Sequence, residues 1–358
     1  MNRAARATID TDALRANLGV VRSVAPTSKV MAVIKANAYG HGIVPVAKAL
    51  TGADAFAVAR LEEARALREA GLQHPIILLE GVFHSDQMEL ASALNLELVV
   101  HCPEQLVMLE QLDRRHRFSV WLKIDTGMNR LGFPVTAAAE ATRRLVDCDV
   151  VADQIRFMTH LSSAEETDES TTTDQIGNFE HFMEGIDAER SIANSAGVIA
   201  WPNSHADWVR PGLMLYGVSP LKDKTALDLG LRPAMTLTSE LIAIRTVPTG
   251  GHVGYGGRWV AQEETRIGVA AIGYGDGYTR HLGDGTPVVV AGQPAALVGC
   301  ISMDLITIDL RRVPSARVGD EVLLWGDRLP VEELAHAAGT IPYEMLCGVT
   351  QRVAMTVI

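Results

Sequence analysis

The sequence lacks the features that mark membrane-spanning, secreted and nucleic-acid-binding proteins. It has no unbroken run of the roughly 18 apolar residues that a membrane-spanning helix needs, and Asp10, Asp12 and Arg15 interrupt the stretch where a signal peptide would carry its apolar centre. Basic residues number 32 and acidic ones 43, a net charge of −11, and no basic tract is present. We therefore expect a cytoplasmic protein whose partners include neither a membrane nor a nucleic acid.

Cysteine is scarce, and its spacing is not that of a metal site. Cys102, Cys148, Cys300 and Cys347 form no C-x-x-C pair and have no nearby histidine pattern that would suit zinc. We expect four free thiols and no metal. The remaining composition, 47% hydrophobic and 21% charged, is that of a globular chain, and 358 residues are enough for two domains.

The first part of the chain alternates short β-branched runs with amphipathic helical stretches, which predicts βα units around a parallel sheet. A helix is expected at 61–71, ending at Gly71. Eight strands favour a closed (β/α)8 TIM barrel of the α/β class over a doubly wound open sheet, whose nucleotide-binding forms carry a glycine fingerprint that is missing after Ile34. The expected strands are 30–34, 55–59, 76–80, 96–101, 118–125, 155–161, 191–194 and 213–217.

The pattern changes after the barrel. Residues 1–219 are assigned to the barrel and 220–233 to a linker. Residues 234–358 contain short strands separated by Gly, Pro and Asp turns, which predicts a β-rich C-terminal domain. A first strand at about 6–10 has no place in the eightfold count and is a candidate for pairing with this second domain.

Lys35 ends the first barrel strand, directly after the apolar run VMAVI. Its amine is therefore expected at the C-terminal rim of the barrel, where such enzymes build their sites. Apolar walls favour the neutral amine that covalent attachment to a carbonyl compound requires. A solvated rim lysine is the alternative reading of this residue alone.

Other rim positions are polar in a coordinated way. A phosphate in this fold usually binds the loops after strands seven and eight, and the Ser195 hydroxyl and the Gly212 backbone suit one. A lysine beside a phosphate site suggests pyridoxal phosphate. The rim residues are Lys123, Arg130, His160, Asn194, Ser195, Arg210 and Gly212.

The sequence resembles the alanine racemase family over nearly its whole length. The motifs that carry the resemblance are, in order, VIKANAYGHG, WLKIDTGMNRLGF, MTHLSSAE, ANSAG, DWVRPGLMLYG, VGYGGRW, IGYGDGY and GCISMD. The resemblance implies a pyridoxal phosphate-dependent isomerase that interconverts L-alanine and D-alanine, supplying D-alanine for cell-wall peptidoglycan or L-alanine for catabolism. It also implies a head-to-tail homodimer of barrel and β domain.

The resemblance assigns two catalytic residues. Lys35 would hold pyridoxal phosphate and act as the base on the D-alanine side, and Tyr255 of the partner subunit would be the opposing base for L-alanine. Two bases are needed because a single group reaches only one face of the planar carbanion. Without the motif, Tyr255 would be a turn tyrosine between glycines.

Arg210 is assigned to the pyridine nitrogen of the cofactor. An arginine keeps its proton there, so the ring is a weaker electron sink and proton transfer stays at the α-carbon. Pairing with Asp207 is the structural alternative. His160 would form a hydrogen bond between Arg210 and Tyr255, or else be a structural histidine at a strand end.

The remaining roles follow from the same motifs. Arg130 and the backbone around Met303 of the partner subunit would bind the substrate carboxylate. Lys123 is a candidate for carbamylation, which would orient Arg130. The other cofactor contacts implied are Tyr39, Asn194, Ser195, Gly212, Leu213 and Tyr343, and the access corridor would contain Tyr274 and Asp304.

Several alternatives stay open at this point. Tyr343 reads equally as an aromatic residue of a packing seam, and Tyr274 as a turn aromatic. Asn129 and Leu213 depart from the commonest family forms, which bears on substrate preference. A barrel decarboxylase of basic amino acids, a non-catalytic pyridoxal phosphate carrier and a racemase of broad specificity are the other functions considered; Cys300 and Cys347 do not fit the decarboxylase pattern.

Overall fold

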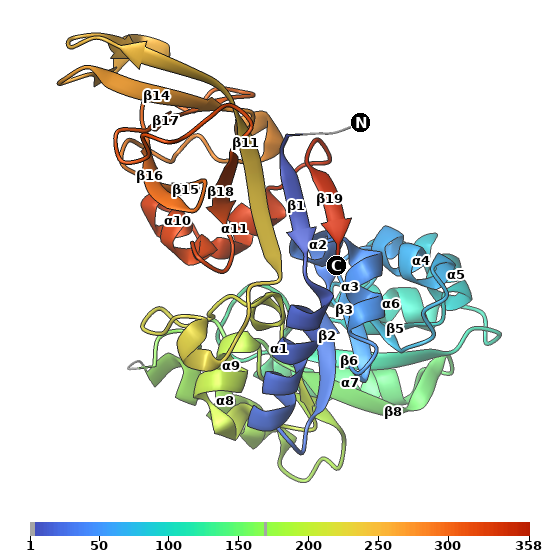
Figure 1. Cartoon of the computed structure of the whole chain (residues 1–358). Coiled ribbons are helices and arrows are strands. Elements are labelled where there is room, and N and C mark those ends of the chain that lie inside the picture. The colour runs from blue at the N-terminus through green and yellow to red at the C-terminus, as the bar shows by residue number, and fades with distance from the viewer. Residues whose placement is uncertain (1–3, 168–169) are drawn as a thin grey trace.

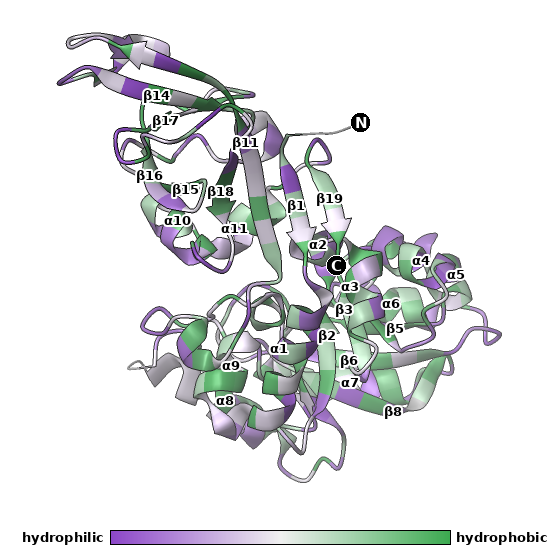
Figure 2. Ribbon diagram, in the orientation of Figure 1, coloured by the Kyte–Doolittle hydropathy of each residue, from purple (hydrophilic) through white to green (hydrophobic). Residues whose placement is uncertain are grey.

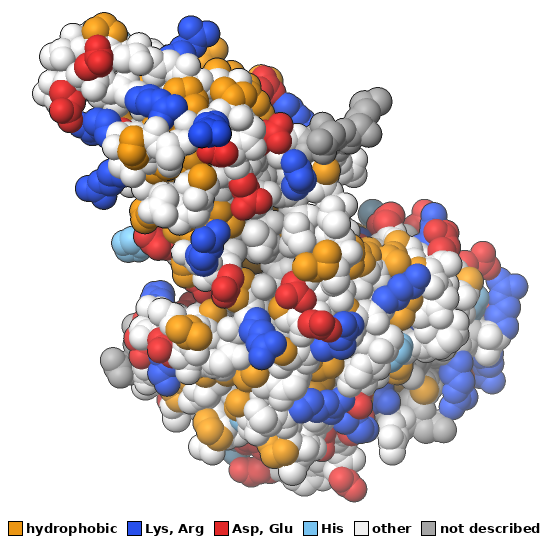
Figure 3. Space-filling model, in the orientation of Figure 1, with side chains coloured by type: hydrophobic (Ala, Val, Ile, Leu, Met, Phe, Trp, Pro, Cys, Tyr) orange, Lys and Arg blue, Asp and Glu red, His pale blue; other side chains and the backbone are white. Residues whose placement is uncertain are grey.

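The computed structural model describes residues 4–167 and 170–358. The chain forms a parallel barrel with helices around it and a second, mainly antiparallel β part, which lie one above the other in Figure 1. Within these residues, no helix combines the length and the apolar character needed to cross a lipid bilayer. Basic and acidic side chains are interspersed on the face that Figure 3 shows, as expected for a chain without a basic tract.

Parallel strands close into a barrel, which confirms the predicted fold class. The sheet order is β5-β4-β3-β2-β10-β9-β8-β6, and pairing of β5 with β6 closes it. Residues 30–33 of β2 are buried, as strands of a sheet covered on both faces must be, and hydrophobic residues follow the strands in Figure 2. The strands are β2 (Lys29–Val33), β3 (Ala55–Val58), β4 (Ile76–Leu78), β5 (Leu96–Val100), β6 (Phe118–Asp125), β8 (Val151–Met158), β9 (Arg190–Ser191) and β10 (Trp208–Val209), with β7 (Phe133–Pro134) beside β6.

Helices cover the outside of the barrel, except for the short segment α2, which lies at the rim. The first is capped by Asp10, whose carboxylate accepts hydrogen bonds from the backbone N–H groups of Asp12 and Ala13 at 2.8 and 3.0 Å. The helix expected at 61–71 ends at Glu69, and Gly71 follows with a φ of +85°. The helices are α1 (Thr11–Val24), α2 (Lys35–Tyr39), α3 (Ile43–Ala49), α4 (Leu61–Glu69), α5 (Gln87–Ala93), α6 (Pro103–Glu110), α7 (Val135–Val146), α8 (Ser170–Met183) and α9 (Ser195–Ala200), with the 3₁₀ turn η1 (Pro202–Ser204) after α9.

The prediction for the eighth strand was wrong. Residues 213–217 were expected to form it, but β10 is the two-residue segment Trp208–Val209, and Leu213–Tyr216 form the 3₁₀ turn η2. The run LMLY is completely buried, and a short buried apolar run does not distinguish a strand from a helical turn. Arg210 and Gly212 therefore follow the eighth strand, at the C-terminal rim, instead of preceding it.

The second part of the chain is built around an eight-stranded sheet in the order β14-β17-β16-β15-β18-β11-β1-β19. Strand β1 pairs antiparallel with β11 and parallel with β19, so the first strand of the chain lies in this sheet. Its elements are β1 (Arg6–Ile9), β11 (Met235–Val247), β14 (Thr265–Ala270), β15 (Pro287–Val290), β16 (Gln293–Leu297), β17 (Ile306–Asp309), β18 (Glu321–Trp325), β19 (Ala354–Val357), α10 (Val331–Ala337) and α11 (Pro342–Cys347). The hairpin of β12 (His252–Val253) and β13 (Trp259–Val260) and the turns η3 (Leu227–Leu229), η4 (Tyr255–Gly257) and η5 (Tyr274–Asp276) complete the described elements.

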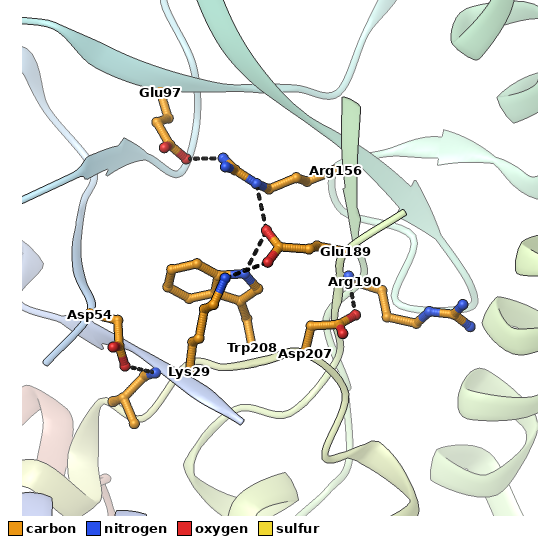
Figure 4. A network of polar contacts seen from close by, with 9 residues as sticks. Lys29, Asp54, Glu97, Arg156, Glu189, Arg190, Asp207 and Trp208 are labelled. Carbon is orange, nitrogen blue, oxygen red and sulfur yellow. Dashed lines mark hydrogen bonds and ion pairs between the residues drawn. The ribbon is translucent and has the colours of Figure 1, made fainter. Parts of the chain in front are cut away.

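A polar network fastens the barrel strands near their N-terminal ends (Figure 4). The Glu189 carboxylate accepts hydrogen bonds from Lys29 Nζ at 2.5 Å, Arg156 Nε at 2.8 Å and Trp208 Nε1 at 3.1 Å. Arg156 donates its Nη1 to Glu97 Oε2 at 2.9 Å. These contacts join β2, β5, β8 and β10 and so stabilise this end of the barrel. In this fold the active site lies at the other, C-terminal end of the strands.

Candidate active site

A cavity of about 610 Å³ opens at the C-terminal rim of the barrel. Its walls come from the loops after several strands and from α11 of the second part. The predicted residues that line it are Lys35, Tyr39, Lys123, Arg130, His160, Asn194, Ser195, Arg210, Gly212, Leu213 and Tyr343. The structure therefore brings together, in one cavity, residues that the sequence spreads over some 300 positions.

The turn that follows Lys35 is strained. Ala36, Asn37, Ala38 and Tyr39 all have a positive φ, between 51° and 54°, so α2 is a left-handed turn made of non-glycine residues. Each such residue costs about 1–2 kcal/mol, so the turn persists only because its surroundings hold it. Backbone strain of this kind concentrates at functional sites, which agrees with the position of Lys35.

Contacts on both sides hold this turn in place. Gly40, with a φ of +81°, ends the turn, and a Cβ atom there would lie 2.2 Å from the carbonyl oxygen of Leu346 in α11. The buried His41 ring donates through Nδ1 to the carbonyl of Tyr39 at 2.9 Å. The turn thus packs against α11 of the second part and forms a hydrogen bond with His41, which follows it in the sequence.

The loops after strands seven and eight pack closely against each other and against Tyr39. Ser195 Oγ accepts hydrogen bonds from the backbone N–H groups of Gly212 at 2.8 Å and Met214 at 3.4 Å. A Cβ atom at Gly212 would lie 2.6 Å from the Tyr39 hydroxyl, so only glycine fits there without a shift. Burial raises the pKa of the Tyr39 phenol, which therefore stays a neutral donor.

Arg210 is buried and held from several directions. It donates to Ser191 Oγ at 2.7 Å, to the Thr159 carbonyl at 2.5 Å and to His160 Nδ1 at 3.3 Å. Burial lowers the pKa of Arg210 to about 10, so the guanidinium still carries its charge at neutral pH. These partners replace the pairing with Asp207 that the sequence left open, since Asp207 accepts from the Arg190 backbone.

Burial and the surrounding cations lower the pKa values of two neighbours of Arg210. Burial, followed by the charges of Arg210 and Lys123, lowers the pKa of His160 well below its ordinary value. A neutral His160 that accepts at Nδ1 carries its proton on Nε2. Burial, followed by Arg210, Arg130 and Lys35, lowers the pKa of Lys123 to about 8.

The cavity also contains residues that sequence reasoning missed. Leu79 and Glu80 follow β4, so the rule that selected the other rim residues could have found them. Cys347 was given no role, yet its thiol lines the cavity from α11, beside Tyr343. The segment IPYEML was open to interpretation as a packing seam, and the structure makes most of it the helix that delivers Tyr343 to the cavity. The additional lining residues are Val33, Ala36, Leu79, Glu80, Leu131, Met158, Thr159 and Cys347.

Four predicted residues lie elsewhere. Among the described residues of one chain, Tyr255, Met303, Tyr274 and Asp304 are not part of the cavity lining. Tyr255 begins the turn η4, between β12 and β13 of the second part, and 70% of its surface is exposed. Met303 is 52% exposed, and its carbonyl accepts from the Gly275 N–H at 2.9 Å, so the loops of Met303 and Tyr274 are joined.

A larger cavity, of about 920 Å³, lies at the opposite end of the barrel. Its charged walls include Arg156, Glu189 and Arg190, which are paired within the network at that end or with neighbouring acids. We assign the chemistry to the smaller cavity because Lys123 and His160, which line it, have lowered pKa values. Perturbed pKa values of this kind are typical of functional sites. No cluster of metal-ligating side chains is found within residues 4–167 and 170–358.

Comparison with known sequences shows which family the chain belongs to. Residues 9–220 match the family described as alanine racemase, N-terminal domain, and residues 234–357 match alanine racemase, C-terminal domain. The alanine racemase of Nitrosococcus oceani is 53% identical over 354 residues, which cover 98% of each chain. That of Vibrio parahaemolyticus is 50% identical and covers 99% of each chain.

Solved structures give the same result for the fold. The biosynthetic alanine racemase from Pseudomonas aeruginosa superposes with a TM-score of 0.96 at 44% identity, covering 100% of both chains. The alanine racemase from Bartonella henselae, whose structure contains covalently bound pyridoxal phosphate, gives 0.90 at 28% identity with the same coverage. The chain belongs to the alanine racemase family.

Proposed function

We propose that this protein interconverts L-alanine and D-alanine, with pyridoxal phosphate held by Lys35 in the rim cavity. The observation that carries the proposal is the convergence on one cavity of the residues expected to hold this cofactor. The cavity also fits the cofactor chemically. Lys35, Lys123, Arg130 and Arg210 line it beside a single carboxylate among the described residues, that of Glu80, so an anionic phosphate ester would relieve the repulsion.

Each end of the cavity suits one part of the cofactor. Ser195, Gly212 and Leu213, with the hydroxyls of Tyr39 and Tyr343, are the proposed phosphate contacts, and Asn194 orders this loop by accepting from the Gly197 N–H at 2.9 Å. Arg210 is the proposed partner of the pyridine nitrogen. Because His160 and the carbonyl oxygens of Thr159 and Ile192 hold it, the guanidinium is fixed as a donor and cannot give the ring its proton easily.

Two groups move the proton. When bound, pyridoxal phosphate withdraws electrons from the α-carbon of an amino acid and weakens its bond to hydrogen. Lys35 then removes or returns a proton at the α-carbon on the D-alanine side, and the partner subunit's Tyr255 does so on the other face. Arg130 holds the substrate carboxylate, with the backbone around the partner subunit's Met303, and so fixes which faces the two bases meet.

A head-to-tail homodimer is part of the proposal, because one chain alone supplies only the Lys35 side of the site. The exposed Tyr255 and Met303, and the nearby Tyr274, present a partly apolar surface on the second part of the chain. A second copy would cover this surface and gain the missing base. Tyr274 and Asp304 would then border the access corridor, where Asp304 forms an ion pair with Arg352.

Carbamylation of Lys123 is also proposed. Its pKa of about 8 gives a substantial fraction of neutral amine at physiological pH, which is the form that attacks carbon dioxide. The nitrogen–carbon bond forms as one amine proton leaves to solvent, and the resulting anion lies among Arg130, Arg210 and Lys35 instead of adding to their charge. A cytoplasmic location completes the proposal, supported by the four cysteines, which are free thiols.

The test is a chiral assay of the full chain loaded with pyridoxal phosphate. L-Alanine should give D-alanine and the reverse, and Lys35→Ala should lose about 10²- to 10⁴-fold in rate, whereas Lys48→Ala, an exposed lysine of α3, should not. After borohydride reduction the cofactor mass should be found on the peptide that contains Lys35. Release of carbon dioxide from lysine or ornithine without racemisation of alanine would support a decarboxylase and contradict the proposal.

A further inference from the structure

We propose that Glu63 is a positioning residue for Lys35 and Tyr39, acting through the backbone N–H of Asn37. The inference rests on the proposed function, since it concerns the same site. Glu63 belongs to α4, the helix predicted at 61–71, to which the proposed reaction assigns no role. Within the described residues it does not line the cavity, so its action must pass through the left-handed turn.

The Glu63 carboxylate joins two segments that follow different barrel strands. Its Oε1 accepts the Asn37 N–H at 3.3 Å, in the turn after β2. Its Oε2 accepts the N–H groups of Ala59 at 2.9 Å and Arg60 at 3.1 Å, in the loop after β3. One oxygen therefore caps the start of α4, while the other holds the strained turn.

The turn needs an external contact of this kind. A left-handed conformation is unfavourable for each of the non-glycine residues in this turn. The turn is therefore stabilised by contacts with the surrounding structure that form only in this conformation. Inside the segment, Asn37 Oδ1 accepts the Ile43 N–H at 2.9 Å, so Asn37 is bound through both its backbone and its side chain. Since Asn37 lies between Lys35 and Tyr39, fixing it fixes the directions of both side chains.

The chemistry of the contact requires a carboxylate of this length. Three N–H donors converge on two acceptor oxygens, and glutamine offers one acceptor oxygen and an NH₂ group. In Glu63→Gln the single oxygen is expected to stay at the cap, where it meets two donors, and the NH₂ group then opposes the Asn37 N–H. Aspartate keeps the charge at the start of α4 but is one methylene shorter, so it cannot reach both segments.

Hydrogen exchange of the cofactor-free chain tests the contact without using the reaction. The variants are Glu63→Gln, Glu63→Asp and, as a control, Glu62→Gln, which changes the exposed neighbouring glutamate of the same helical turn. We expect the peptide covering residues 35–43 to exchange about tenfold faster in both Glu63 variants and at the wild-type rate in Glu62→Gln. Exchange at the wild-type rate in Glu63→Gln would overturn the inference.

The loaded enzyme provides the second measurement. We expect pyridoxal phosphate to bind the two Glu63 variants about tenfold more weakly, and kcat for alanine to fall while KM changes little, because the turn positions Lys35 and not the substrate carboxylate. If the variants differ from Glu62→Gln only in melting temperature, Glu63 is merely structural and the inference is wrong. If wild type itself does not racemise alanine, the proposed function fails, while the exchange experiment still decides the contact.

Discussion

Replacement of Gly40 by alanine tests whether the second part of the chain holds the turn after Lys35. Gly40 has a φ of +81°, and a Cβ atom there would lie 2.2 Å from the carbonyl oxygen and 3.0 Å from the carbonyl carbon of Leu346. Leu346 belongs to α11, which also carries Tyr343 and Cys347 to the cavity. An added methyl group would therefore push the turn and the cavity wall apart.

Gly71 provides a matched control for the magnitude. Its φ is +85°, close to that of Gly40, and a Cβ atom there meets no heavy atom within 4 Å in the described structure. Gly71→Ala therefore measures the backbone strain alone, about 1–2 kcal/mol. Gly40→Ala adds the overlap with a backbone carbonyl, and overpacking of this kind costs about 1–3 kcal/mol. The total loss of stability in Gly40→Ala should therefore be about 2–5 kcal/mol.

Urea unfolding of the cofactor-free chains, followed by circular dichroism, gives the two losses of stability. A pyridoxal phosphate titration of the same proteins then shows whether the cavity wall has moved. We expect weaker cofactor binding in Gly40→Ala and unchanged binding in Gly71→Ala. Equal destabilisation by the two substitutions, with equal cofactor affinity, would refute the reasoning that α11 presses on this turn.

Two further predictions concern pH. The pKa of Lys123 falls from 10.5 to about 8 on folding, so between these values only the unfolded chain keeps the proton, and the free energy of unfolding should rise with pH by about 3 kcal/mol. Lys123→Met should remove this rise in carbonate-free urea titrations; an identical rise in both proteins would contradict it. Burial raises the pKa of Glu189, but hydrogen bonds from Lys29 and Trp208 outweigh it and leave the pKa below its ordinary value. Its stabilisation is therefore present above about pH 4 and lost as the pH falls, so Glu189→Gln should be less stable at pH 7 by about 1–2 kcal/mol and should lose less stability on acidification than wild type.

The sequence predicted the barrel because most of its strands are long enough to carry a pattern. Residues 118–125 were expected to form a strand and do so with the same bounds. An apolar, mostly buried run of eight residues is long enough for its pattern to indicate a strand. The eighth strand has only two residues, Trp208 and Val209, and the longer apolar run after it drew the prediction away. Short elements at the end of a barrel are determined by their neighbours and not by their own sequence.

The site could be predicted as a set of residues but not as a geometry. The polar positions at strand ends and the motifs named eleven of the residues that line the cavity. Neither indicated that KANAY adopts a left-handed turn, because alanine and tyrosine have no local preference for it. That conformation depends on contacts with Glu63 and with α11, which lie far away in the sequence. Cys347 was missed for the same reason, since its place in the cavity comes from the docking of the second part.

Complementation between two inactive variants tests most directly that each site combines Lys35 of one chain with Tyr255 of the other. Lys35→Ala and Tyr255→Phe chains would be purified separately, mixed in equal amounts under conditions of subunit exchange, and assayed for racemisation with pyridoxal phosphate. Half of the dimers should be hybrids with one intact site, so about a quarter of wild-type activity should return. Activity that stays at the level of the separate variants, although hybrids are demonstrated by mass, would contradict the account.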